Sequence, residues 1–160
     1  MYRRILVPLD GSDRAERALK HASELAHGRS GHLLLLHVVE PPVIAGPVVA
    51  AGAPGTTASP QLITLDDAMT RAQEEAQRYL EGKKSELDAE SVSCEILLEQ
   101  GGVVQKIAEA AEKSEVDLVV MTSHGRSGLA AAFFGSVAIG VLHRLEKPIL
   151  LIRADRDAEE

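Results

Sequence analysis

A segment rich in glycine and hydroxyl side chains, near the carboxyl end of the chain, has the residue types needed to hold an anion. It covers residues 122–128 (TSHGRSG) and is followed by Gly135 and Ser136. Because glycine has no Cβ, phosphate oxygens can approach the backbone closely and several N–H groups can converge on them. The helix that we expect to begin near Ser136 adds free N–H groups and a favourable dipole. The segment therefore predicts a phosphate site, and a glycine-rich connection without a ligand is the alternative.

Strand and helix patterns alternate along the chain around this segment. Short apolar runs predict five strands, near residues 5–7, 33–39, 92–98, 117–121 and 148–152. Helical periodicity predicts four helices, near residues 13–26, 65–87, 103–111 and 137–145. Asp13 would be the N-cap of the first helix, with Glu16 at the capping-box spacing. This alternation is typical of an α/β fold with a doubly wound parallel sheet and helices on both faces.

In such a fold, ligands bind beyond the carboxyl ends of the strands. Three segments should therefore meet there: Pro8-Leu9-Asp10 after the first strand, His37-Val38-Val39 at the end of the second strand, and the glycine-rich segment after the fourth. Asp10 has two interpretations at this point. It could face a ligand, or its carboxylate could stabilise the turn that follows the strand by accepting nearby N–H groups.

Composition narrows the class of protein. The 160 residues suit one domain, which we place at residues 1–153, followed by a charged tail at 154–160. A net charge of -7 and an aromatic content of 2% argue against a nucleic-acid partner. No apolar run is long enough for a membrane span. The single cysteine, Cys94, lies in an alternating pattern typical of a buried thiol in a reducing compartment, so we expect a cytoplasmic protein.

One stretch interrupts the alternation. Residues 41–61 contain no charged side chain, are rich in Pro, Gly, Ala and Val, and follow neither the helical nor the strand period. We therefore expect residues 41–64 to form a flexible loop insertion near the mouth of the site, because it leaves the carboxyl end of the second strand.

The common nucleotide-binding motifs are absent from the sequence. It has neither GxxxxGK[ST] nor a GxGxxG motif after a strand, which disfavours P-loop enzymes and dinucleotide-dependent dehydrogenases. It has instead Gly125, nine residues, and then Gly135-Ser136.

That spacing, together with the strand pattern, resembles the universal stress protein family. The resemblance extends over nearly the whole chain, in RRILVPLDGSDRAERALKHA, LLLLHVV, DLVVMTSHGRSGL, FFGSVAIGVL and KPILLIR. It implies a Rossmann-like sheet of five parallel strands in the order 3-2-1-4-5 and a homodimer. It also implies, for the nucleotide-binding branch, an ATP site with the motif G-x2-G-x9-G-[ST].

On this resemblance, Pro8 and Val38 would line the adenine, and the segments around Gly125 and Ser136 would hold the ribose and phosphates. Asp10 would face the ribose or a Mg²⁺ ion on the nucleotide. The full set of implied nucleotide-binding residues is Pro8, Leu9, Asp10, Val38, Met121, Thr122, Ser123, His124, Gly125, Arg126, Ser127, Gly128, Gly135, Ser136 and Val137. The ligand would be ATP, with AMP or ADP as alternatives.

Two positions in this set have alternative interpretations. Thr122 stands where the motif has glycine, and a threonine would be costly there if the backbone needed a positive φ. Arg126 is the one basic residue of the glycine-rich segment, and it could screen phosphate charge or point into solvent.

These features predict an ATP-binding, dimeric regulatory protein of the stress response. The alternatives are a slow or partner-dependent ATPase and a stress protein of the branch that does not bind nucleotide. Phosphoryl transfer needs a positioned water, charge neutralisation and a bound metal. No catalytic residue is predicted, because the sequence offers no dedicated base beyond Asp10 and His124 and no arginine clamp. We expect the homodimer to form through the edge strand from Pro148 to Ile152, whose apolar run would otherwise be exposed.

Overall fold

The computed structural model describes residues 2–27, 30–41, 65–123 and 134–153. In chain order the elements are β1 Arg4–Pro8, α1 Asp13–Ala26, β2 His32–Val39, α2 Leu65–Ala89, β3 Ser93–Gln100, α3 Val103–Lys113, β4 Leu118–Thr122, α4 Ser136–Arg144 and β5 Ile149–Ile152. The predicted alternation is confirmed, with strand and helix ends shifted by a residue or two. The expected loop insertion lies outside the described residues from residue 42 onward, as does the charged tail.

The five strands form one parallel sheet in the order β3-β2-β1-β4-β5, as predicted. Strand β2 is an interior strand between β3 and β1, and its residues Leu33 to Leu36 are buried on both faces of the sheet. An interior parallel strand needs apolar side chains on both faces, since helices cover it from both sides.

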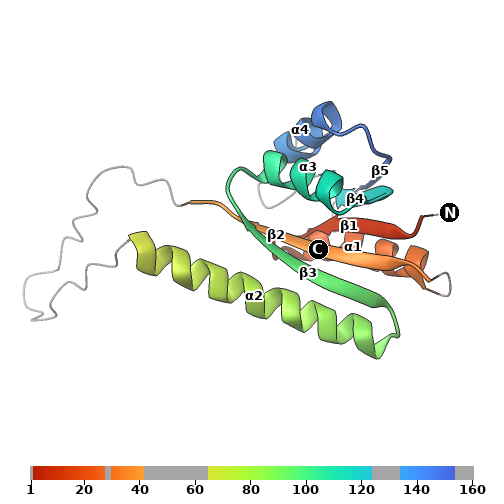
Figure 1. Cartoon of the computed structure of the whole chain (residues 1–160), viewed down its shortest axis with the longest axis horizontal. Coiled ribbons are helices and arrows are strands. Elements are labelled where there is room, and N and C mark those ends of the chain that lie inside the picture. The colour runs from red at the N-terminus through yellow and green to blue at the C-terminus, as the bar shows by residue number, and fades with distance from the viewer. Residues whose placement is uncertain (1, 28–29, 42–64, 124–133, 154–160) are drawn as a thin grey trace, which may run out of the picture.

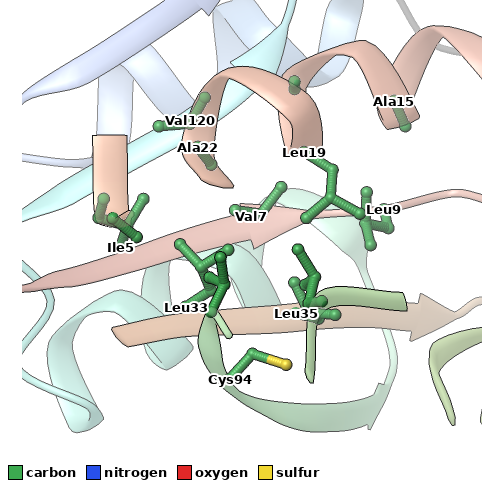
Figure 2. Packing of buried hydrophobic residues seen from close by; sticks show 14 of the residues in the cluster. Ile5, Val7, Leu9, Ala15, Leu19, Ala22, Leu33, Leu35, Cys94 and Val120 are labelled. Carbon is green, nitrogen blue, oxygen red and sulfur yellow. The ribbon is translucent and has the colours of Figure 1, made fainter. Parts of the chain in front are cut away.

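Helices cover the two faces in pairs, and each pair closes its own apolar core (Figure 1). Helices α1 and α2 pack against one face, where Figure 2 shows Leu19 and Ala22 of α1 lying against Val7 of β1. Helices α3 and α4 pack against the other face, over Leu34 of β2 and Val119 of β4. Because successive strand residues point to opposite faces, one strand contributes to both cores.

The start of α1 differs from the prediction. Ser12, not Asp13, is the N-cap: its backbone is extended and its Oγ accepts a hydrogen bond from the N–H of Ala15 at 3.2 Å. Asp13 is the first helical residue, where its charge still favours the helix dipole. The error is a one-residue shift between two good capping residues, which sequence pattern does not separate.

Candidate nucleotide pocket

A pocket of about 890 Å³ opens at the carboxyl end of the sheet. Its walls come from the ends of β1, β2 and β4, from the start of α4, and from the sides of α2 and α3. The predicted site residues that line it are Pro8, Leu9, Asp10, Val38, Met121, Thr122, Ser123, Gly135, Ser136 and Val137. Residues far apart in sequence thus meet where the doubly wound topology predicts.

The remaining predicted residues are His124, Gly125, Arg126, Ser127 and Gly128, and they lie outside the described residues. The ends of their segment, however, are joined. The N–H of Gly135 donates to the carbonyl oxygen of Ser123 at 2.6 Å, and the N–H of Ser123 donates to Ile152 of β5 at 2.9 Å. Ser123 and Gly135, which line the pocket, are therefore held together beside the end of β5.

Helix α4 presents its N-terminus to this point. Gly135 is the N-cap, with φ -70° and an extended ψ, and has no side chain with which to cap the first turn. Ser136 and Val137 follow as the first helical residues and line the pocket. Backbone N–H groups at the start of a helix, together with the Ser136 hydroxyl, form a suitable environment for a phosphate.

Thr122 satisfies the condition set by its place in the motif. It is the last residue of β4, paired with Ile152 and only 8% exposed, so its backbone is extended rather than left-handed. A β-branched residue is well suited to such a position. The replacement of glycine by threonine therefore causes no backbone strain here.

Asp10 forms the turn after β1. Its Oδ1 accepts hydrogen bonds from the N–H of Ser12 at 3.0 Å and from the Ser12 hydroxyl at 2.6 Å, and Gly11 between them has φ 79°. The turn-forming interpretation of Asp10 is therefore confirmed. The carboxylate also lines the pocket, so a second role toward a ligand is compatible with the first.

Apolar side chains form the wall on the α3 side of the pocket. Val103, Val104 and Ile107 of α3 line it together with Val38 and Met121, and all five belong to the core of that face. Ligand-binding pockets are lined mainly by apolar side chains, and a wall of this kind suits a flat apolar ring.

Tyr79 of α2 forms part of the opposite wall and was not among the predicted site residues. Its ring meets that of His37 edge to face, with centroids 6.3 Å apart, and its hydroxyl donates to Glu16 Oε1 at 3.3 Å. Burial, followed by the negative charge of Glu16, raises the pKa of Tyr79 well above its usual range. Ala72, Ala76 and Tyr79 recur at helical spacing, and all three line the pocket. This spacing could have indicated Tyr79 as a site residue.

Glu16 also ties α1 to α2 through Lys83. Lys83 Nζ lies 3.0 Å from Glu16 Oε2 and 3.1 Å from Glu86 Oε2. Burial lowers the pKa of Lys83, but the hydrogen bonds to Glu16 and Glu86 outweigh it, and the net shift is upward. The two helices that flank the Tyr79 side of the pocket are thus held by one shared carboxylate.

The charged side chains among the described lining residues of the pocket are acidic. Its lining includes Asp10, Glu40 and Glu75, and no lysine or arginine occurs among the lining residues that the structure describes. Nor do the described residues contain a group of three or more His, Cys, Asp or Glu side chains that could hold a metal ion. One carboxylate is nevertheless sufficient where a phosphate brings Mg²⁺ with it, since Mg²⁺ takes most of its ligands from water and phosphate. Asp10 fits that role.

None of the helices within the described part of the chain has the length and apolar character needed to cross a bilayer.

Comparisons with known proteins agree with this architecture. Residues 1–153 match the model of the universal stress protein family. Universal stress protein MJ0577 of Methanocaldococcus jannaschii is 30% identical over 156 residues, which cover 96% of each chain. The solved structure of MJ0577 aligns with a TM-score of 0.77 and 27% identity, again over 96% of each chain.

Two further solved structures share the fold and contain an adenine nucleotide. One is a universal stress protein in complex with cAMP (TM-score 0.60, 21% identity, 95% of this chain and 97% of that chain). The other is a universal stress protein from Archaeoglobus fulgidus in complex with dAMP (TM-score 0.61, 24% identity, 94% of this chain and 98% of that chain).

Proposed function

Because this chain belongs to the universal stress protein family, we propose that it binds an adenine nucleotide in the pocket at the carboxyl end of its sheet. In this proposal the nucleotide regulates a dimeric protein of the stress response. The base lies in the apolar slot beside Val38, and the phosphate lies at the N-terminus of α4.

The observation that carries the proposal is the meeting of an apolar slot and a helix N-terminus in one cavity. Val38, Val103 and Val104 supply the apolar wall, and Gly135 and Ser136 supply the N–H groups and the hydroxyl. A nucleotide needs both environments at once, because its base is largely apolar and its phosphate is anionic. The cAMP and dAMP complexes of the two neighbours support an adenine nucleotide as the ligand class.

The acidic lining affects which nucleotide binds best. Asp10, Glu40 and Glu75 oppose a bare triphosphate, so ATP requires Mg²⁺ to offset their charge, whereas AMP carries fewer charges and needs it less. We propose ATP with Mg²⁺ held through Asp10 as the ligand, with AMP or ADP as alternatives.

The first experiment is mass spectrometry of the purified protein after denaturation, because a co-purified nucleotide would be released and identified. Calorimetric titration of the parent and of two variants, Gly135→Val and Ser136→Ala, then tests the site. Gly135→Val should abolish binding, because a branched side chain blocks the close approach of phosphate to the backbone. Ser136→Ala removes one hydrogen bond to a charged group, worth roughly 1.5–3 kcal/mol, and should weaken binding roughly 10- to 150-fold.

Matched controls separate these effects from changes in folding. Ser85→Ala and Gly82→Val make the same substitutions on α2 at residues that do not line the pocket. Both controls should bind as the parent does. Equal affinity in the parent and the site variants would show that α4 does not contact the nucleotide. A parent without affinity for any adenine nucleotide would favour the family branch that does not bind nucleotide.

Slow ATP hydrolysis is the second candidate function, and the same pocket would serve it. Released ADP or phosphate from purified parent protein, lost in Gly135→Val, would support hydrolysis. Intact ATP after prolonged incubation with Mg²⁺ would leave nucleotide binding alone.

A further inference from the structure

Helices α3 and α4 approach each other closely at one glycine. A methyl group at Gly140 of α4 would lie 2.7 Å from Cγ2 and 3.0 Å from Cγ1 of Val104 on α3. Carbon atoms that are not bonded pack at about 3.5–4.0 Å. The present spacing of the two helices at this point is therefore possible only without a side chain at residue 140.

Val104 has little freedom to make room by itself. It is β-branched and lies in the first turn of α3, and a β-branched side chain in a helix strongly prefers one χ1 rotamer. Both of its methyl groups face Gly140. A side chain at residue 140 must therefore move α4 relative to α3.

Each of the two helices carries a different part of the pocket. Val103, Val104 and Ile107 of α3 belong to the apolar wall, whereas Ser136 and Val137 of α4 lie at the helix N-terminus. The distance between the base environment and the phosphate environment thus depends on how closely α3 and α4 pack.

We propose that Gly140 is a positioning residue that fixes the spacing between these two environments, so that the pocket recognises base and phosphate as one ligand. This inference rests on the proposed nucleotide function and specifies how the site selects a complete nucleotide. A ligand that spans both helices depends on their spacing. A fragment that contacts only one of them does not.

Gly140→Ala tests the proposal, with AMP, adenosine and ribose 5-phosphate as ligands in calorimetric titrations. AMP affinity should fall by roughly tenfold or more, which corresponds to about 1.4 kcal/mol. The affinities for adenosine and for ribose 5-phosphate should each remain within roughly threefold of the parent, or about 0.7 kcal/mol. Gly82→Ala is the control, because a methyl group at Gly82 on α2 meets nothing within 4 Å.

The double variant Gly140→Ala with Val104→Ala tests the contact itself. Removing the Val104 methyl groups makes room for the new side chain, so the double variant should bind AMP as tightly as Val104→Ala alone. If Gly140→Ala does not fold, the comparison of the double variant with Val104→Ala still tests the proposal. A lower AMP affinity in the double variant than in Val104→Ala would overturn it.

Two further results would overturn it. In one, Gly140→Ala binds AMP as the parent does. In the other, Gly140→Ala loses affinity for AMP and for both fragments by the same factor, as expected if the glycine only maintains the fold. A parent that binds AMP makes either result specific to Gly140, whereas a parent that binds no nucleotide refutes the proposed function and this inference with it.

Discussion

At the residue scale, Asp10 combines a structural role with a proposed ligand role. Its Oδ1 holds the turn by accepting two hydrogen bonds from Ser12, and its carboxylate lines a pocket in which no lysine or arginine occurs among the described lining residues. The amide of an asparagine can accept the same bonds from Ser12 but carries no charge. Charge and turn geometry can therefore be separated at this position.

Asp10→Asn should weaken the dependence of ATP affinity on Mg²⁺. In the parent, Mg²⁺ should strengthen ATP binding, and in the variant this gain should shrink by roughly 10- to 150-fold, as expected for losing a contact with a charged group. AMP affinity should change little. Calorimetric titrations of both nucleotides with and without Mg²⁺ measure the effect.

Asp13→Asn is the matched control, because Asp13 is exposed in the first turn of α1 and does not line the pocket. Identical Mg²⁺ dependence in the parent and Asp10→Asn would place the metal elsewhere.

Tyr79 should make the stability of the fold depend on pH in the alkaline range. Its pKa in the folded chain is raised, chiefly by burial and then by Glu16, so the folded state keeps the phenol proton at pH values where the unfolded chain loses it. This contribution is fully present below the ordinary tyrosine pKa of about 10. The unfolding free energy should then fall as pH rises above that value, because the unfolded state binds fewer protons.

Tyr79→Phe should remove this part of the pH dependence. Urea unfolding followed by circular dichroism between pH 8 and pH 11 should show a smaller alkaline loss of stability in the variant than in the parent. Tyr2→Phe, at an exposed residue, is the control. Parallel curves for the parent and Tyr79→Phe would contradict the assignment.

At the element scale, Gly31 and Gly82 have different tertiary surroundings. A methyl group at Gly31, just before β2, would lie 2.7 Å from Cα and 2.9 Å from Cβ of Ala26 at the end of α1. The backbone of α1 cannot move without disturbing its packing on the sheet. Gly82, in the middle of α2, has open space around the same atom.

Gly31→Ala should therefore destabilise the protein by about 1–3 kcal/mol through overpacking. Gly82→Ala should stabilise it by about 0.5–1 kcal/mol, since glycine weakens a helix interior. Urea unfolding of the two variants and the parent measures both values. Equal stability of Gly31→Ala and the parent would mean that the connection between α1 and β2 yields easily.

At the scale of the whole molecule, β5 ends the sheet with an apolar edge. Leu150 is 37% exposed there, and Ile139 and Leu142 on α4 are also exposed. By contrast, Ile149 and Leu151 pack against the core under α3 and α4, so replacing them would also disturb folding. An exposed apolar edge strand promotes aggregation unless another strand or chain covers it. We propose that a second copy of the chain covers β5 in a homodimer.

Leu150→Lys should convert this dimer to monomers in sedimentation velocity, because two-fold symmetry brings the new charges together. Leu65→Lys is the control, at another exposed leucine, 47% exposed at the start of α2. It should leave the dimer intact. Dimers that persist in Leu150→Lys would place the interface on another surface.

The sequence by itself determined the elements and the end of the sheet at which the site lies. Apolar runs such as residues 33–39 and the helical stripe through Ala15, Ala18 and Leu19 indicate which residues are buried. The reason is that side chains on the buried face of a helix or strand recur with the period of that element. The strand order came from the family resemblance. The alternation of strands and helices located Pro8, Val38 and Ser136 at the carboxyl edge, where the structure places them.

Only the tertiary structure decided which elements touch across that edge. Periodicity identifies the buried side of α2, but the packing of α2 beside β2 is what brings Tyr79 into the pocket next to His37. The sequence pattern assigned no role to Gly140, and only the packing of α3 against α4 shows its contact with Val104. Thr122 fits without backbone strain because β4 continues through it. The physical reason is that a sequence pattern shows only which side chains of one helix or strand face the core and which face solvent. The distance between two elements depends on the side chains of both.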